Sequence, residues 1–219
     1  PEWLSTWPVA AQQPQWLHCW PQTKGAPVDG DRFQAIRESV IEGFVSLAPD
    51  KLMELLAAAY YQLGTGYMAR YTSFRWEGRL VGISEPDPVT LEHLVGYEHH
   101  KDILCQNTAG FLKHGKGNNV LLYGERGTGK SSMIKAVANL YREEGLYLIE
   151  LRQRHVDTFW ELLELLRTKP LQHFIIYIDD LSFDRGDGDY HSFKGILEGG
   201  AAAIPQNVLL YATSNRRHL

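Results

Sequence analysis

Beyond residue 88 the chain alternates between two patterns of apolar residues. Short continuous apolar runs are typical of strands that are buried on both faces of a parallel sheet. The segments between these runs, such as residues 132–140 and 156–167, carry apolar residues at helical spacing. Strands that alternate with helices favour an α/β fold, in which helices flank a parallel sheet core. The expected strands cover residues 119–123, 146–151, 174–178 and 207–212.

The preceding region is expected to be mainly helical. Asp31 can cap a helix whose apolar residues recur at helical spacing as far as Phe44. A second helix is expected to begin near Pro49 and to end at Gly64. Residues 71–83 then indicate two short strands that form a hairpin.

Tryptophan and proline are concentrated at the start of the chain. Residues 1–30 contain four of the six tryptophans and five of the ten prolines. This composition disfavours regular elements and favours an aromatic-rich wrap that packs over another surface through its rings. A docking arm for a partner is the alternative interpretation. We place the domain boundary in the loop at residues 85–88, so that an N-terminal domain spans residues 1–88 and a core domain spans residues 89–219.

Residues 124–131 read Gly-Glu-Arg-Gly-Thr-Gly-Lys-Ser, a complete phosphate-binding loop, or Walker A motif. The loop lies between an expected strand and an expected helix, so its N–H groups and the positive helix end can face one phosphate. Lys130 is expected to reach the β- and γ-phosphates, and Ser131 to ligate Mg²⁺. We therefore expect the chain to bind a nucleoside triphosphate. The expected contacts are Gly124, Glu125, Arg126, Gly127, Thr128, Gly129, Lys130, Ser131 and Ser132.

A pair of carboxylates follows the expected strand at residues 174–178. The carboxyl ends of parallel strands meet their ligand at one edge of the sheet. Asp179 is therefore expected to hold Mg²⁺ through water, and Asp180 to orient or deprotonate the attacking water. The strand at residues 207–212 runs into Thr213-Ser214-Asn215, whose polar side chains could hold the same water, although such a sequence is often only a turn.

These three elements, in this order, resemble the AAA+ ATPases over roughly residues 92–219. The resemblance implies that Asp179-Asp180 is the second acidic motif (Walker B) and that Asn215 senses the γ-phosphate. Leu94-Val-Gly-Tyr-Glu98 is similar to the segment that covers the adenine, which implies contacts from Val95, Gly96 and Tyr97. A narrower resemblance is to a bacterial AAA+ family catalogued as a domain of unknown function. Its motifs match residues 179–183, 197–200 and 211–219.

The chain departs from the wider AAA+ pattern at three points. Most AAA+ ATPases carry Asp-Glu where this chain carries Asp179-Asp180, and the shorter side chain at 180 predicts slow hydrolysis. Residues 152–155 read Arg-Gln-Arg-His where AAA+ protein translocases carry an aromatic pore loop. An AAA+ module also needs a fifth core strand, a helical lid and a lid arginine beyond Leu219. We therefore expect an incomplete core, truncated before the lid.

Two functions remain open. The AAA+ resemblance implies an ATPase that assembles into a ring in the full-length protein and hydrolyses ATP to remodel an unidentified macromolecule. The Asp-Asp pair and the lack of an aromatic pore loop favour instead a switch or scaffold that binds ATP and hydrolyses it slowly. A DNA-replication loader is a weaker third interpretation, because a net charge of −4 does not favour nucleic acid.

The remaining composition indicates a cytoplasmic protein with no membrane contact. The two cysteines, Cys19 and Cys105, form no disulfide framework and are expected to be free thiols in a reducing compartment. Neither a run of about 18–20 apolar residues nor a signal-peptide pattern occurs in the sequence.

Overall fold

The computed structural model describes residues 30–64, 68–181 and 204–215. The chain forms two compact units, Pro1–Tyr71 and Thr72–Leu219. The expected N-terminal wrap lies outside the described residues, as do residues 197–200 and 216–219 of the narrower family motifs.

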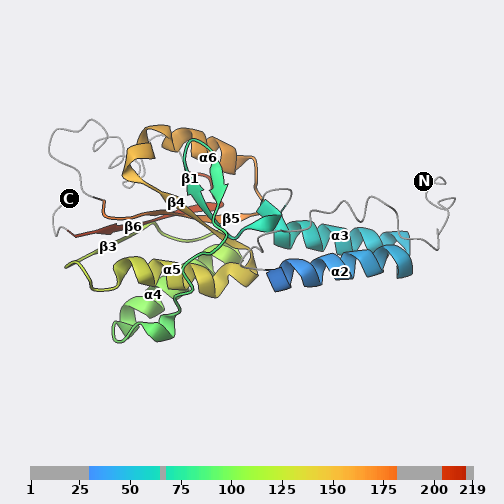
Figure 1. The fold of residues 1–219 in the computed structure, drawn as a ribbon, viewed down its shortest axis with the longest axis horizontal. Coiled ribbons are helices and arrows are strands. Elements are labelled where there is room, and N and C mark those ends of the chain that lie inside the picture. The colour runs from blue at the N-terminus through green and yellow to red at the C-terminus, as the bar shows by residue number, and fades with distance from the viewer. Residues whose placement is uncertain (1–29, 65–67, 182–203, 216–219) are drawn as a thin grey trace. The chain divides into compact units, whose positions relative to one another are not determined.

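The first unit contains the two expected helices, α2 (Gly30–Ser46) and α3 (Pro49–Leu63), which pack against each other (Figure 1). Proline is tolerated at the start of α3 because the first N–H groups of a helix have no intrahelical partner. The helix ends where Gly64 takes a positive φ of 66° and donates its amide to the carbonyl of Tyr60 at 2.9 Å. A short 3₁₀ helix, η2 (Met68–Arg70), follows.

The second unit is built on a sheet with the strand order β2-β1-β4-β5-β6-β3. Every neighbouring pair is parallel except the hairpin of β1 and β2. The strands are β1 (Ser73–Trp76), β2 (Leu80–Gly82), β3 (Val120–Tyr123), β4 (Leu146–Leu151), β5 (His173–Ile178) and β6 (Val208–Ser214). The expectation of an α/β fold with a parallel core sheet of the P-loop type is confirmed.

Helices cover both faces of this sheet (Figure 1). On one face α4 (Glu98–His114) and α5 (Lys130–Tyr141) bury Leu104, Phe111, Ile134 and Val137 against alternate residues of β4, β5 and β6. On the other face lies α6 (Phe159–Arg167), whose apolar stripe is fully buried. Short 3₁₀ helices, η3 (Leu91–His93), η4 (Arg142–Glu144) and η5 (Gln153–Thr158), connect these elements.

The hairpin corrects the expected domain boundary. We placed residues 71–83 in the N-terminal domain, but β1 pairs with β4 along its whole length, from Ser73 beside Leu148 to Trp76 beside Leu151. The Trp76 indole also donates to the hydroxyl of Thr158 at 2.9 Å. The hairpin therefore extends the core sheet, and the two units divide between Tyr71 and Thr72 rather than near residue 88.

Asn207 joins the end of α6 to the start of β6. Its side chain is 8% exposed, and its amide nitrogen lies within hydrogen-bonding distance of three carbonyl oxygens. The distances are 3.2 Å to Leu166, 2.8 Å to Lys169 and 3.1 Å to Gln172. Since the last carbonyls of a helix have no intrahelical partner, the two N–H groups of this amide serve carbonyls at the end of α6 and in the turn that follows it.

Candidate functional site

The loop between β3 and α5 has the backbone conformation that a phosphate-binding loop requires. Gly124, Gly127 and Gly129 have φ values of 149°, 81° and 81°, a region that other residues rarely adopt. Gly129 is the N-cap of α5, so the positive end of this helix opens directly onto the loop. The amide of Gly124 donates to the carbonyl of Ser214 at 3.2 Å and ties the loop to the end of β6.

Lys130, the first residue of α5, folds back over its own loop. Its ammonium group donates to the carbonyls of Gly124 at 2.8 Å and Glu125 at 2.6 Å. The Thr128 hydroxyl donates to the same Glu125 carbonyl at 2.9 Å. The loop thus carries a fixed positive charge beside the N–H groups at the start of α5, an arrangement suited to an anion.

Asp179 follows β5 and lies beside Ser131 of α5. The Ser131 hydroxyl and the Thr213 hydroxyl each donate to Oδ1 of Asp179 at 2.7 Å. Partial burial acts to raise the pKa of Asp179, but the neighbouring hydroxyls of Tyr177, Thr213 and Ser131 and the charge of Lys135 outweigh it and hold the pKa below its ordinary value. The carboxylate therefore stays ionised next to the hydroxyl at the end of the phosphate-binding loop.

This pair fits a magnesium ion by the chemistry of its oxygen donors. Mg²⁺ prefers hard oxygen ligands and is usually held by one or two protein groups, water and the phosphates of a substrate. Ser131 and Asp179 supply a hydroxyl and a carboxylate that are already in contact, at the edge of the sheet where the loop turns. We expected these two residues to hold the metal, and the structure brings them together.

Asp180 and Asn215 also meet, in a way the sequence did not indicate. Asp180 has a φ of 50°, which is uncommon for a residue other than glycine. Its amide donates to the Thr213 hydroxyl at 2.9 Å, and its carboxylate Oδ1 accepts a hydrogen bond from the Asn215 amide at 2.7 Å. The residue expected to position water and the residue expected to sense the γ-phosphate are therefore directly bonded.

The segment expected to cover the adenine lies next to the loop. A Cβ placed on Gly129 would lie 3.6 Å from a methyl carbon of Leu94. Val95 and Tyr97 follow with 94% and 51% of their surface exposed, and Tyr97 takes a positive φ of 61° as N-cap of α4. Lys101 of α4 fixes this segment, because its ammonium donates to the Leu94 carbonyl at 2.5 Å and to the Glu98 carboxylate at 2.9 Å.

Three residues make contacts in this site that the sequence did not indicate. Thr213 was named with Ser214 and Asn215 as a polar strand end that could hold the attacking water, but β6 continues to Ser214 and places the hydroxyl of Thr213 beside Asp179. Lys101 was hidden within an amphipathic helix, and it is only 8% exposed. Tyr177 belonged to an apolar run, but its hydroxyl reaches the carboxylate region. A hydroxyl at the end of a strand is the signal that could have indicated the contact between Thr213 and Asp179.

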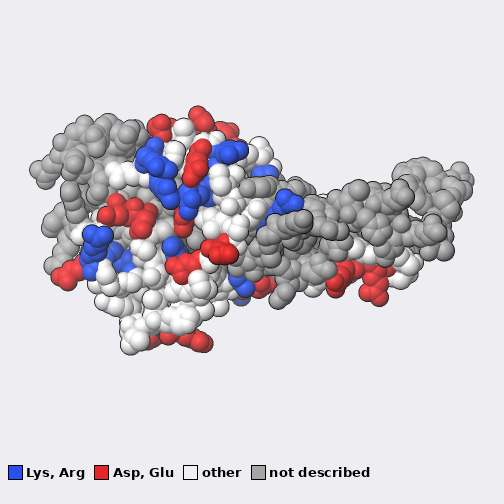
Figure 2. Space-filling model, in the orientation of Figure 1, with Lys and Arg blue, Asp and Glu red and all other residues white. Residues whose placement is uncertain are grey.

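Charged side chains beyond the loop are paired with one another. Lys135 of α5 lies 3.6 Å from Asp87 and 3.9 Å from Glu150, and Arg75 of β1 lies 3.7 Å from Glu150. On the face that Figure 2 shows, basic and acidic side chains of the Thr72–Leu219 unit lie next to each other. Among the described residues, this face presents no extended basic patch.

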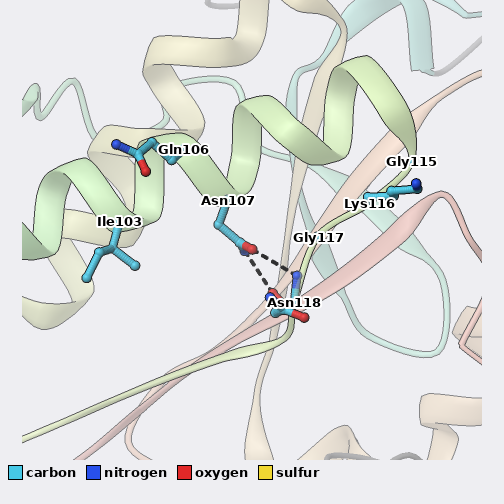
Figure 3. A pocket seen from close by; sticks show the side chains of 7 residues that line it. All are labelled: Ile103, Gln106, Asn107, Gly115, Lys116, Gly117 and Asn118. Atoms are coloured by element: carbon cyan, nitrogen blue, oxygen red, sulfur yellow. Dashed lines mark hydrogen bonds between the residues drawn. The ribbon is translucent and has the colours of Figure 1, made fainter.

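A separate shallow pocket lies at the opposite end of β3 (Figure 3). Asn107 points from α4 to the loop before β3, where its side chain accepts from the Asn118 amide at 2.9 Å and donates to the Asn118 carbonyl at 2.8 Å. Because this loop precedes β3 and the phosphate-binding loop follows it, the pocket is not part of the site above.

Within residues 30–64, 68–181 and 204–215, every helix falls short of the length and hydrophobicity that a membrane span needs.

Comparison with known proteins identifies a family and more distant relatives. A family described as "Protein of unknown function (DUF815)" matches residues 69–219. The replication factor C large subunit of Methanococcus vannielii is 29% identical over 114 residues, which are 51% of this chain and 23% of that protein. A mitochondrial AAA-ATPase of Arabidopsis thaliana is 41% identical over 81 residues, 36% of this chain and 17% of that protein. The match thus spans less than a quarter of either relative.

Two solved structures are similar at a lower level of sequence identity. Caenorhabditis elegans PCH-2 is 18% identical with a TM-score of 0.42, over 57% of this chain and 39% of that one. A variant of Thermotoga maritima RuvB is 19% identical with a TM-score of 0.42, over 59% of this chain and 42% of that one. The resemblance to AAA+ ATPases and to a family of unknown function, which the motifs indicated, is confirmed by the family match and the curated relatives.

Proposed function

The chain belongs to the DUF815 family, and from this premise we propose that it is an ATP-binding AAA+ core that hydrolyses ATP to remodel a macromolecular partner. One observation carries the proposal. The Ser131 hydroxyl at the end of the phosphate-binding loop donates to the Asp179 carboxylate at the end of β5 at 2.7 Å. Two segments 48 residues apart in the sequence thus form one cation and phosphate site.

Each residue of the site has a distinct task in this proposal. The N–H groups of Gly127–Ser132 and the Lys130 ammonium bind the phosphates, and Ser131 and Asp179 hold the cation. Bound Mg²⁺ supplies charge neutralisation at the phosphates during transfer. Asp180 orients the attacking water and accepts its proton, and Asn215 holds the same water or the γ-phosphate in line. The segment of Val95, Gly96 and Tyr97 covers the adenine, and Lys101 holds it through the Leu94 carbonyl.

A second function is favoured by the bond between Asn215 and Asp180. The Asn215 amide donates to Oδ1 of Asp180 at 2.7 Å, so this carboxylate oxygen already has a partner and is not free to accept a hydrogen bond from an attacking water. With the short Asp side chain at this position, the chain would bind ATP and turn it over slowly. It would then act as a nucleotide-dependent switch or scaffold whose bound state a partner reads.

ATP turnover of the full-length protein, measured beside an Asp180→Asn variant, separates the two functions. Size-exclusion runs with and without Mg²⁺–ATP report on assembly in the same samples. Turnover that Asp180→Asn abolishes, with ATP-dependent assembly, supports the remodelling ATPase. Tight ATP binding with negligible turnover supports the switch.

Binding of a fluorescent ATP analogue to Lys130→Ala tests the site itself. The variant should lose most of its affinity, because it lacks the charge at the loop. Lys113→Ala is a matched control, since Lys113 is an exposed lysine in the last turn of α4. Equal affinity of Lys130→Ala and the parent would contradict the assignment of the site.

A further inference from the structure

Tyr177 carries a buried hydroxyl next to the Asp179 carboxylate. It lies on β5 two residues before Asp179, so both side chains point to the sheet face that α5 covers. The residue is 3% exposed, and its hydroxyl oxygen has no hydrogen-bond partner of standard geometry among the described residues. A buried hydroxyl without a partner is unfavourable compared with phenylalanine of the same shape.

Tyr211, the neighbouring tyrosine on the same sheet face, has a hydroxyl with hydrogen-bond partners. Tyr211 of β6 lies directly opposite Tyr177 in the strand register. Its hydroxyl is 2.7 Å from the Thr108 hydroxyl and accepts from the Asn107 amide at 3.0 Å. The fold therefore supplies two partners for one tyrosine of this cross-strand pair and none of standard geometry for the other.

The surroundings of the Tyr177 hydroxyl point to the cation site. The side chains beside it are Asp179, Ser131 and Thr213. These three side chains already bond to one another, because Ser131 and Thr213 both donate to Oδ1 of Asp179. The Tyr177 hydroxyl thus lies beside a carboxylate whose Oδ1 already accepts two hydrogen bonds.

We propose that Tyr177 is a positioning residue for the cation, and that its hydroxyl hydrogen-bonds the hydration shell of a Mg²⁺ ion held by Ser131 and Asp179. This inference rests on the proposed function. Mg²⁺ retains several of its waters in protein sites, and those waters need acceptors and donors around them. Partners outside the first coordination shell orient the ligands and typically change metal affinity when they are removed.

The test is a Mg²⁺ titration of the parent and of Tyr177→Phe, in which the fluorescence of a bound ATP analogue is the measured signal. The variant should need roughly tenfold more Mg²⁺ for half-saturation, as expected for loss of an outer partner. Binding of the analogue in EDTA should be unchanged. Thermal unfolding without nucleotide should show equal or higher stability, since the change removes a hydroxyl without a partner.

Tyr147→Phe is the matched control. Tyr147 is also 3% exposed and lies on β4, but its ring packs with Phe74 and Phe174 at centroid distances of 6.2 and 5.5 Å, on the other face of the sheet. Its Mg²⁺ requirement should equal that of the parent. The inference would be overturned if Tyr177→Phe had the same Mg²⁺ requirement as the parent, or if lower stability were its only change. Either result would leave the proposed function intact. A parent protein whose nucleotide binding ignores Mg²⁺ would overturn the proposed function itself.

Discussion

The side-chain amide of Asn215 donates to the carboxylate of Asp180 at 2.7 Å, joining the end of β6 to the end of β5. In the proposed site the positions of these two side chains therefore depend on each other. Asn215→Ala should reduce ATP turnover by roughly 10²-fold, the usual effect of removing one donor that acts in the transition state. Affinity for the ATP analogue should change little, because the phosphate-binding loop is intact. Turnover equal to that of the parent would contradict the role of Asn215.

Thr213 should contribute to both stability and cation binding. Its hydroxyl donates to Asp179 and accepts from the amide of Asp180. Thr213→Val removes both bonds and leaves that amide without its acceptor, so the free energy of unfolding should fall by about 1–3 kcal/mol. Thr213→Ser keeps the hydroxyl and should retain the parent's Mg²⁺ requirement. Urea denaturation and the Mg²⁺ titration measure the two effects, and equal behaviour of the Val and Ser variants would refute the role.

Lys101 should contribute to nucleotide affinity without touching the nucleotide. The residue is 8% exposed, and its ammonium holds the Leu94 carbonyl. Lys101→Met keeps the apolar stem but releases this carbonyl, and loss of a charged hydrogen bond should weaken ATP binding by about tenfold. Glu98→Gln serves as the control, because Glu98 is exposed and glutamine still offers an acceptor. Calorimetry on both variants would decide, and comparable losses in the two would count against a specific role for the lysine.

Removal of the side-chain N–H donors of Asn207 should destabilise the fold. Asn207→Asp places a carboxylate against the three carbonyls of Leu166, Lys169 and Gln172, and should cost about 3–5 kcal/mol at neutral pH. This environment disfavours the charged form, so the folded-state pKa of the introduced carboxyl lies above its unfolded value. The destabilisation should therefore grow as pH rises through the unfolded pKa. Asn207→Ala should show a smaller loss that does not depend on pH, as urea denaturation at two pH values would reveal.

His173 should make the stability depend on pH near neutrality. Burial lowers the pKa of this imidazole, which lies edge-to-face with the Phe111 ring at 5.1 Å. The unfolded chain therefore binds the proton at higher pH than the folded chain does. Its contribution is complete above the unfolded pKa of about 6.5 and declines as pH falls through that value. The melting temperature of the parent should fall more steeply with decreasing pH than that of His173→Gln, between about pH 7.5 and 5. Equal dependence of the two melting temperatures on pH would contradict the effect.

The elements that could be predicted from the sequence are those whose signal is local. Each parallel strand is a short apolar run, and the loop at Gly124–Ser131 is a contiguous motif, so the core fold and the placement of Ser131 and Asp179 followed from neighbouring residues. The hairpin at Ser73–Gly82 was assigned to the other domain because nothing within it specifies its partner. Its pairing with β4 depends on residues more than 70 positions away.

The side chains that could not be predicted act through positions far apart in the chain. Thr213 meets Asp179 because β6 lies next to β5, and the strand order is set by packing rather than by any local pattern. The bond between Asp180 and Asn215 has the same origin. Lys101 differs from a solvated lysine only through its burial, which depends on the segment before α4. Such contacts are consequences of topology, and a single sequence does not display topology.

The strand order also bears on how the protein is made. Strand β3 ends at Tyr123 in the phosphate-binding loop, but among the described strands its neighbour is β6, which begins at Val208. A ribosome that has synthesised the whole loop, to Ser131, must add 77 further residues before it reaches Val208, the first residue of that partner strand. The proposed nucleotide site is thus complete only after β6 has been synthesised, so a nascent chain that ends before this strand should not bind ATP.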